Sequence, residues 1–186
     1  MADNIMTDNI MTDKTGKNIY AFAGSFNPPH IGHMLAVRQM LDMGADRIHI
    51  FVRSNKKLDL ADAATKERWF NTMKEEYAST GWDKVVIHMV ESKKVTGKSY
   101  SLKIVRDAIK QLDTEAGEHI THYYAGDDYK KFRPFWRFIT KETRLVIGAR
   151  TEGISSTAIR NNLEGNRFLL PPYIYEDLKK IAENRK

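Results

Sequence analysis

The chain has 186 residues and a formal net charge of +6, with 41% apolar and 29% charged residues, which suits one globular domain with a sizeable core. The absence of cysteine excludes disulfide bonds and thiolate metal sites, and it fits a cytoplasmic location. No apolar run is long enough to cross a membrane and no secretory signal is visible, so we expect no membrane partner.

The N-terminal segment differs from the rest of the chain. Asp3-Asn4-Ile5-Met6-Thr7 repeats as Asp8-Asn9-Ile10-Met11-Thr12, in a polar stretch without a helical or strand period. We therefore expect residues 1–17 to form a flexible tail, with a short interaction motif as the alternative, and residues 18–186 to form the domain.

From residue 18 onward, short apolar runs alternate with helical stretches. The apolar runs predict strands over residues 18–23, 47–52, 85–90, 119–125 and 144–148. The helical periods predict helices over 31–43, 61–78, 101–112, 157–163 and 173–184. This alternation favours an α/β fold, a Rossmann-like parallel sheet flanked by helices on both faces in a single domain. Such sheets bind ligands beyond the carboxyl ends of their strands, where the strand order reverses.

Directly after the first predicted strand, the chain reads Gly-Ser-Phe-Asn-Pro-Pro-His-Ile-Gly-His. Gly24 leaves room for a ligand, and Ser25 and Phe26 offer backbone N–H groups near a helix start, where phosphates bind well. His30 and His33 share one face of the first helical turn. For each ring, the alternative is a structural or solvated histidine. A metal site is the weaker interpretation, because no third ligand lies nearby in the sequence. The string as a whole predicts a phosphate site.

A second anion-binding pattern lies about 120 residues downstream. Ser155, Ser156 and Thr157 form a cluster of helix-capping hydroxyls, and Arg160 follows one turn later, where its guanidinium would grip a phosphate. An ordinary helix cap with a solvated arginine is the alternative.

Together the two segments resemble the G-x-F-x-P-x-H-x-G-H and I-S-S-T-x-I-R motifs of the nucleotidylyltransferase superfamily. The resemblance implies that His30, His33 and Arg160 are the catalytic residues, with the two histidines at the phosphates around the reacting bond. It also implies that Ser156, Thr157 and Arg160 hold the β- and γ-phosphates of ATP. The ATP-binding loop would comprise Gly24, Ser25 and Phe26.

A third segment, Gly-Asp-Asp-Tyr-Lys-Lys-Phe-Arg-Pro-Phe-Trp, is similar to the G-x-D-x7-W segment of nicotinate and nicotinamide mononucleotide adenylyltransferases. The resemblance places Gly126 and Asp128 at the ATP ribose and Trp136 against the pyridine ring. A carboxylate suits a ribose diol, and an indole offers a flat face to a cationic ring. Two alternatives stay open, Asp127 as the ribose contact and Trp136 as a core aromatic.

The remaining mononucleotide contacts rest on weaker similarity. Ser99 and Tyr100 belong to a stretch that resembles the family's S-Y-T-x-D-T-L segment, although Ser101 replaces the threonine. Lys56 and Lys57 follow the second predicted strand, where the family places basic residues near the mononucleotide phosphate. The resemblance also assigns Ser25 and Phe26 to this substrate.

The resemblance implies an adenylyltransferase that joins ATP to nicotinamide or nicotinate mononucleotide, giving NAD or deamido-NAD and pyrophosphate. Mg²⁺ would bind through the ATP phosphates, without protein metal ligands. The alternatives are a nucleotidylyltransferase that uses CTP or another acceptor, or a non-catalytic nucleotide- or nucleic-acid-binding protein, for which the positive charge is the support. The scattered basic residues make nucleic acid the weaker alternative. The sequence does not decide between nicotinamide and nicotinate mononucleotide. It does not decide the oligomeric state either, and a homo-oligomer stays open.

Overall fold

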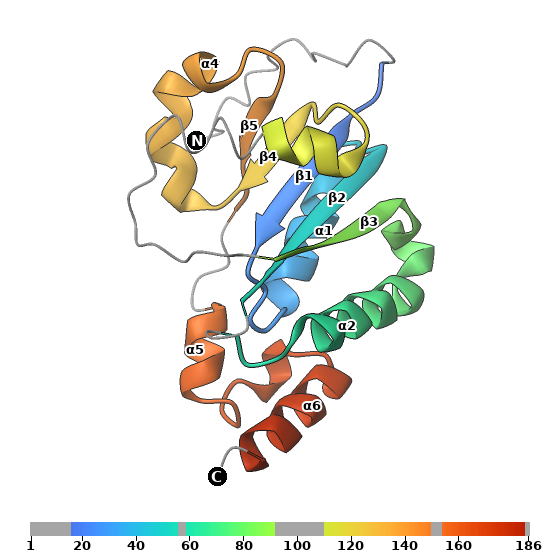
Figure 1. Cartoon of the computed structure of the whole chain (residues 1–186), viewed down its shortest axis with the longest axis vertical. Helices are drawn as coiled ribbons and strands as arrows, with labels where there is room; N and C mark the ends of the chain where they lie inside the picture. The colour runs from blue at the N-terminus through green and yellow to red at the C-terminus, as the bar shows by residue number, and fades with distance from the viewer. Residues whose placement is uncertain (1–15, 56–58, 92–109, 150–153, 185–186) are drawn as a thin grey trace, which may run out of the picture.

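The strands form one parallel sheet. The computed structural model describes residues 16–55, 59–91, 110–149 and 154–184 (Figure 1). The strands in these ranges are β1 (Ile19–Gly24), β2 (Arg47–Ser54), β3 (Val85–Glu91), β4 (His122–Ala125) and β5 (Arg144–Ile147). They lie in the order β3-β2-β1-β4-β5, and all their pairings are parallel. The predicted Rossmann-like sheet is confirmed, and its order reverses between β1 and β4.

Helices connect and cover the strands. They are α1 (Ile31–Asp42), α2 (Ala63–Glu76), α4 (Trp136–Ile139), α5 (Ser156–Asn161) and α6 (Pro172–Glu183), with short 3-10 turns at Ala78–Thr80, Trp82–Lys84, Asp127–Phe135 and Arg167–Leu169. Residues 110–116 are also helical, so the helix predicted over 101–112 ends later than expected, and its earlier part lies outside the described residues. Figure 1 shows α5 and α6 beyond the end of the sheet toward which β1 points. No helix in the described ranges is long and apolar enough to span a bilayer.

The sheet is buried on both faces, as the continuous apolar runs of its strands predict. Alternate residues of β2 enter different cores, with Ile48 and Ile50 on one face and Phe51 on the other. The first core receives apolar side chains from α1, α2 and α6. The second receives Leu112, Phe132, Trp136 and Ile139 from the opposite side. Helices on both faces are therefore confirmed.

Element boundaries shift where side chains take over backbone bonds. The strand predicted from residue 119 begins only at His122, because Thr121 Oγ1 accepts the Ile19 N–H at 2.8 Å in place of a strand carbonyl. The helix predicted from residue 61 begins at Ala63, because Asp62 caps it by accepting the Thr65 N–H at 2.8 Å. These shifts leave the predicted order of elements unchanged.

Candidate active site

A polar cleft of about 610 Å³ opens at the carboxyl ends of β1, β4 and β5, where the strand order reverses. Seven of the predicted site residues line it, namely Ser25, His30, His33, Gly126, Asp128, Ser156 and Thr157. They come from three segments that are far apart in sequence. The fold thus brings the three motifs to one place, at the crevice expected to bind ligands in an open parallel sheet.

The start of α1 is capped by its own two histidines. His30 is the N-cap residue, and its Nδ1 accepts the Gly32 N–H at 3.2 Å. In return, His33 Nδ1 accepts the His30 N–H at 3.1 Å. The two rings lie against each other, with centroids 3.8 Å apart. This is a capping box built from imidazoles, and it uses the backbone N–H groups of His30 and Gly32, not those of Ser25 and Phe26 that the sequence suggested for a phosphate.

The capping bonds fix the protonation of both rings. A ring nitrogen that accepts an N–H bond carries no proton, so each neutral ring bears its hydrogen on Nε2. Burial lowers the pKa of His30 to about 4. Burial also holds the pKa of His33 well below its usual value, and the neighbouring His30 ring lowers it further. At neutral pH both side chains are therefore uncharged Nε2–H donors before an anion arrives.

The loop between β1 and α1 is shaped around Phe26. This residue has a φ of 45°, unusual for a residue with a side chain, and its ring is fully buried. The ring packs 4.7 Å from His33 and 5.1 Å from Phe70, measured between centroids. A Cβ at Gly24 would lie 3.1 Å from the Phe26 ring, which explains the glycine there. The buried ring of Phe26 thus anchors the loop that carries the predicted ATP contacts.

The second motif docks directly onto the first. Arg160 Nη1 donates to the Asn27 carbonyl at 2.6 Å and Nη2 donates to Thr157 Oγ1 at 3.1 Å. The Ser156 hydroxyl donates to the Pro28 carbonyl at 2.9 Å, so its single hydrogen is committed within the protein. Ser155 Oγ caps α5 by accepting the Ala158 N–H at 3.1 Å. Because α5 has only six residues, its dipole adds little, and side-chain and N-terminal N–H donors carry the anion-binding capacity.

The third motif also lines the cleft. Gly126 and Asp128 both line the cleft, and a Cβ on Gly126 would approach Asp128 Oδ1 to 3.2 Å. Asp127 also lines the cleft but pairs with Lys130 at 2.7 Å. Both carboxylates therefore lie at the cleft, and Asp127 differs from Asp128 in that it forms an ion pair with Lys130.

The other predicted residues lie elsewhere. Trp136 is 7% exposed in the second core, where its Nε1 donates to the Thr143 carbonyl at 2.6 Å and its ring stacks on Tyr123. Four predicted mononucleotide contacts, Lys56, Lys57, Ser99 and Tyr100, lie outside the described residues. The ATP side of the predicted site is thus described in full, whereas most of the mononucleotide side is not.

Two polar residues near the site, the half-buried Gln39 and the buried Lys66, were not identified from the sequence. Gln39 on α1 accepts the Tyr124 hydroxyl and the Ala149 N–H, which ties α1 to the ends of β4 and β5. Lys66 on α2 is fully buried and binds the loop after β1. A signal for Lys66 exists in the sequence, because it occupies an apolar position of the stripe that continues with Trp69, Phe70 and Met73.

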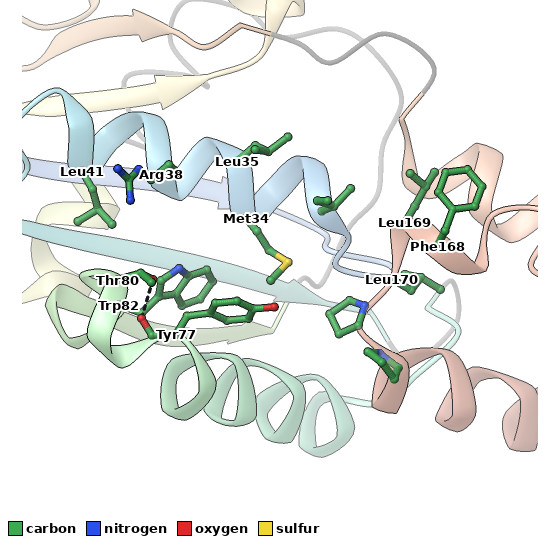
Figure 2. Close-up of a pocket in the computed structure, with 13 residues that line it drawn as sticks. Met34, Leu35, Arg38, Leu41, Tyr77, Thr80, Trp82, Phe168, Leu169 and Leu170 are labelled. Carbon is green, nitrogen blue, oxygen red and sulfur yellow. Dashed lines mark hydrogen bonds between the residues drawn. The ribbon is translucent and has the colours of Figure 1, made fainter.

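A second hollow has the wrong chemistry for a triphosphate. It has a volume of about 420 Å³ and lies between α1, the turn around Trp82 and the segment 168–172. Figure 2 shows it lined by Met34, Leu35, Leu41, Tyr77, Trp82, Phe168, Leu169 and Leu170. Two of its polar side chains already have partners, because Arg38 pairs with Asp42 and the Thr80 hydroxyl donates to Tyr77 O. It holds none of the predicted site residues.

The polar cleft, with two motif segments docked across it, is the arrangement expected of a nucleotidylyltransferase. Comparison with known proteins agrees. The model of the family described as Cytidylyltransferase-like matches residues 21–162, so the chain belongs to this family of nucleotidylyltransferases.

Within this family, the chain is similar to individual named relatives and solved structures. A probable nicotinate-nucleotide adenylyltransferase from Streptococcus mutans is 25% identical, over 90% of this chain and 89% of the relative. One of the same name from Listeria monocytogenes is 26% identical, over 84% and 92%. The structure of Plasmodium falciparum nicotinic acid mononucleotide adenylyltransferase, complexed with NaAD, superposes with a TM-score of 0.61 at 14% identity, covering 88% of this chain and 95% of that chain. At that identity the match supports the fold alone.

Proposed function

We propose that this protein transfers the adenylyl group of ATP to the phosphate of nicotinate or nicotinamide mononucleotide, giving deamido-NAD or NAD and pyrophosphate. The observation that carries the proposal is the single cleft that gathers His30, His33, the 155–157 segment and Asp128. The names of the two curated relatives support a pyridine mononucleotide as the acceptor, and nicotinate mononucleotide is the first one to test.

The chemistry needs no protein nucleophile. An ionised phosphate oxygen of the mononucleotide attacks the α-phosphorus of ATP in line, a new P–O bond forms, and the bond to the β-phosphate oxygen breaks. Negative charge grows on the leaving pyrophosphate and on the α-phosphate oxygens. The Nε2–H groups of His30 and His33 would stabilise that charge, and Arg160 would hold the pyrophosphate portion. A bound triphosphate would raise the pKa of both rings and strengthen these bonds.

Mg²⁺ fits this cleft as a partner of the substrate. Among the described residues, no three His, Asp or Glu side chains converge as a protein-only metal site. The hydroxyls and carboxylates that line the cleft are hard oxygen donors of the kind that Mg²⁺ accepts beside phosphate oxygens and water. When bound, the ion would neutralise charge across the phosphates, while the residues of this chain orient them.

Product analysis tests the proposal. Purified protein is incubated with Mg²⁺, ATP and either nicotinate or nicotinamide mononucleotide, and dinucleotide and pyrophosphate are quantified together. Equal amounts of both products are expected with at least one mononucleotide. Replacement of ATP by CTP is the matched control and should give little product. Absence of dinucleotide with both mononucleotides would rule the proposal out.

One observation favours a second candidate, adenylyl transfer to a different phosphorylated acceptor. Trp136 is buried and hydrogen-bonded to Thr143, so it offers little open ring surface to a pyridine. Assays of Trp136→Ala separate the two candidates. A loss of mononucleotide affinity that exceeds the loss of ATP affinity supports the pyridine acceptor. Equal losses make Trp136 a core residue and direct the search to other acceptors, read by pyrophosphate release.

A further inference from the structure

Lys66 is a buried charge that the predicted motifs leave unused. Its side chain is 0% exposed, and its Nζ donates to Ser25 O at 2.7 Å, Arg53 O at 3.1 Å and Asp59 Oδ2 at 2.6 Å. All three ammonium hydrogens are therefore satisfied within the protein. Burial lowers the pKa of Lys66, and the Asp59 carboxylate opposes that shift. Lys66 has no donor left for a substrate, so any effect on the reaction must pass through its partners.

Those partners belong to the two loops that the reaction would use. Ser25 follows β1 in the predicted ATP loop, and Arg53 lies at the end of β2. Asp59 and Asn55 flank the predicted mononucleotide lysines on either side, and they bond to each other. The Asn55 N–H donates to Asp59 Oδ2 at 2.7 Å, and the Asp59 N–H donates to Asn55 O at 3.0 Å. One ammonium thus joins the ends of both loops.

A second contact supports the same connection. The Leu60 N–H donates to Asn27 Oδ1 at 2.9 Å, which links the segment after β2 to the loop after β1. Lys66 therefore lies at the buried centre of a set of hydrogen bonds that connects the two loops. Its charge is the part of this set that one substitution can remove.

The α2 helix also sets the direction of one predicted phosphate donor. Phe70 lies one turn beyond Lys66 and packs on the Phe26 ring, while Lys66 holds the adjoining Ser25 carbonyl. In a planar trans peptide the carbonyl and the following N–H point in opposite directions. By holding the Ser25 oxygen, Lys66 therefore fixes the direction of the Phe26 N–H.

We propose that Lys66, together with Asp59, is a positioning residue that sets the ATP loop after β1 against the end of β2 and its neighbour Asp59, so that the reacting phosphates meet in line. This inference rests on the proposed function. A misplacement of about 1 Å between reacting groups can cost about 10²-fold in rate, which is the size of effect expected here.

The test uses the double variant Lys66→Met/Asp59→Asn, because Lys66→Met alone removes the ammonium that offsets the buried Asp59 charge and lowers stability. Lys84→Met is the matched control. Lys84 is an exposed lysine that also donates to a backbone carbonyl, Ala45 O at 3.2 Å, but it lies before β3 at the opposite end of the sheet. Melting curves, kcat and both KM values are measured for each protein.

The double variant is expected to melt cooperatively and to lose about 10²-fold in kcat, with smaller changes in both KM values, because Lys66 touches neither substrate. The Lys84→Met control should keep its kcat. A folded double variant with wild-type kcat overturns the proposal. If the double variant does not melt cooperatively, Asp59→Asn alone decides, with a loss of about tenfold in kcat expected and an unchanged kcat as the contrary result.

Failure of the proposed function would be visible separately. It would appear as a wild-type protein that makes no dinucleotide from either mononucleotide. In that case Lys66 is tested by titrating the wild type and the double variant with ATP and Mg²⁺. About tenfold weaker ATP binding by the variant supports the positioning of the β1 loop, and equal affinity contradicts it.

Discussion

The two helices that begin at the cleft are capped by different chemistry. At α1 the caps are imidazoles, because Nδ1 of His30 and of His33 accept backbone N–H bonds. At α5 the cap is the Ser155 hydroxyl. A histidine has a second ring nitrogen, so one side chain both closes the helix and keeps a donor for a ligand. Under the proposed function the α5 helix would divide these tasks, with Ser155 as its cap and Thr157 and Arg160 as the phosphate contacts.

The largest predicted effect separates the two tasks that His30 combines. In His30→Asn the amide oxygen can still accept the Gly32 N–H, so the α1 cap survives, but the Nε2–H donor is lost. We expect kcat to fall about 10²–10³-fold, or about 3–4 kcal/mol in the barrier, with a melting temperature near that of the wild type. Initial rates of pyrophosphate release and thermal melts measure the two effects. Near-wild-type kcat in the asparagine variant would show that His30 is only a cap.

A second prediction uses the titration that only α1 has. The pKa of His30 is about 4 in the folded protein and about 6.5 when unfolded, so the unfolded chain binds more protons between these values. The free energy of unfolding should therefore rise between pH 4 and pH 6.5, and the His30 ring should contribute about 3 kcal/mol to this rise. Above pH 6.5 the contribution of the ring should be fully present.

Urea unfolding at pH 4.0, 5.0 and 6.5 measures this rise. His30→Asn should flatten the curve, while Ser155→Ala should leave its shape unchanged because serine does not titrate. Some slope will persist in the asparagine variant, because burial also lowers the pKa of His122 to about 4. An unaltered slope in His30→Asn would mean that the ring is not held neutral by the fold.

The contrast between the two helix starts was only partly predictable. The sequence predicted both anion sites and the sheet crevice that joins them, because strand period, glycine placement and hydroxyl clusters are local signals. The use of His30 Nδ1 for the cap was not predictable. It depends on ring placement, which the buried Phe26 ring and the neighbouring His33 ring determine.

Long-range partners limit the rest of the prediction. The Lys66 ammonium contacts Ser25, 41 residues away, so its role depends on how α2 packs on the sheet. The sequence reveals the motif in Asp127–Phe135 but does not predict its 3-10 helix, since the segment has neither a helical nor a strand period. Trp136 follows that segment into the second core, a position that spacing alone does not reveal.

A third prediction concerns the docking of α5 onto the first motif. Arg160 spans two acceptors, Asn27 O and Thr157 Oγ1, which a lysine ammonium at the same position would not bridge in the same geometry. We expect Arg160→Lys to lower kcat/KM for ATP about tenfold, by about 1.4 kcal/mol. The control is Arg38→Lys, at an exposed ion pair with Asp42, where little change is expected. Equal behaviour of the two variants would mean that charge alone, not the guanidinium fork, matters at α5.

The smallest predicted effect tests whether α5 really divides its tasks. Ser155→Ala removes the oxygen that accepts the Ala158 N–H, so it should cost about 1 kcal/mol of stability. It should leave the KM for ATP within about twofold, because the neighbouring residues supply the anion donors. Chemical unfolding and steady-state kinetics on the same preparation measure both quantities. A large rise in KM without a loss of stability would show that Ser155 itself binds phosphate, and that α5 combines cap and ligand contact as α1 does.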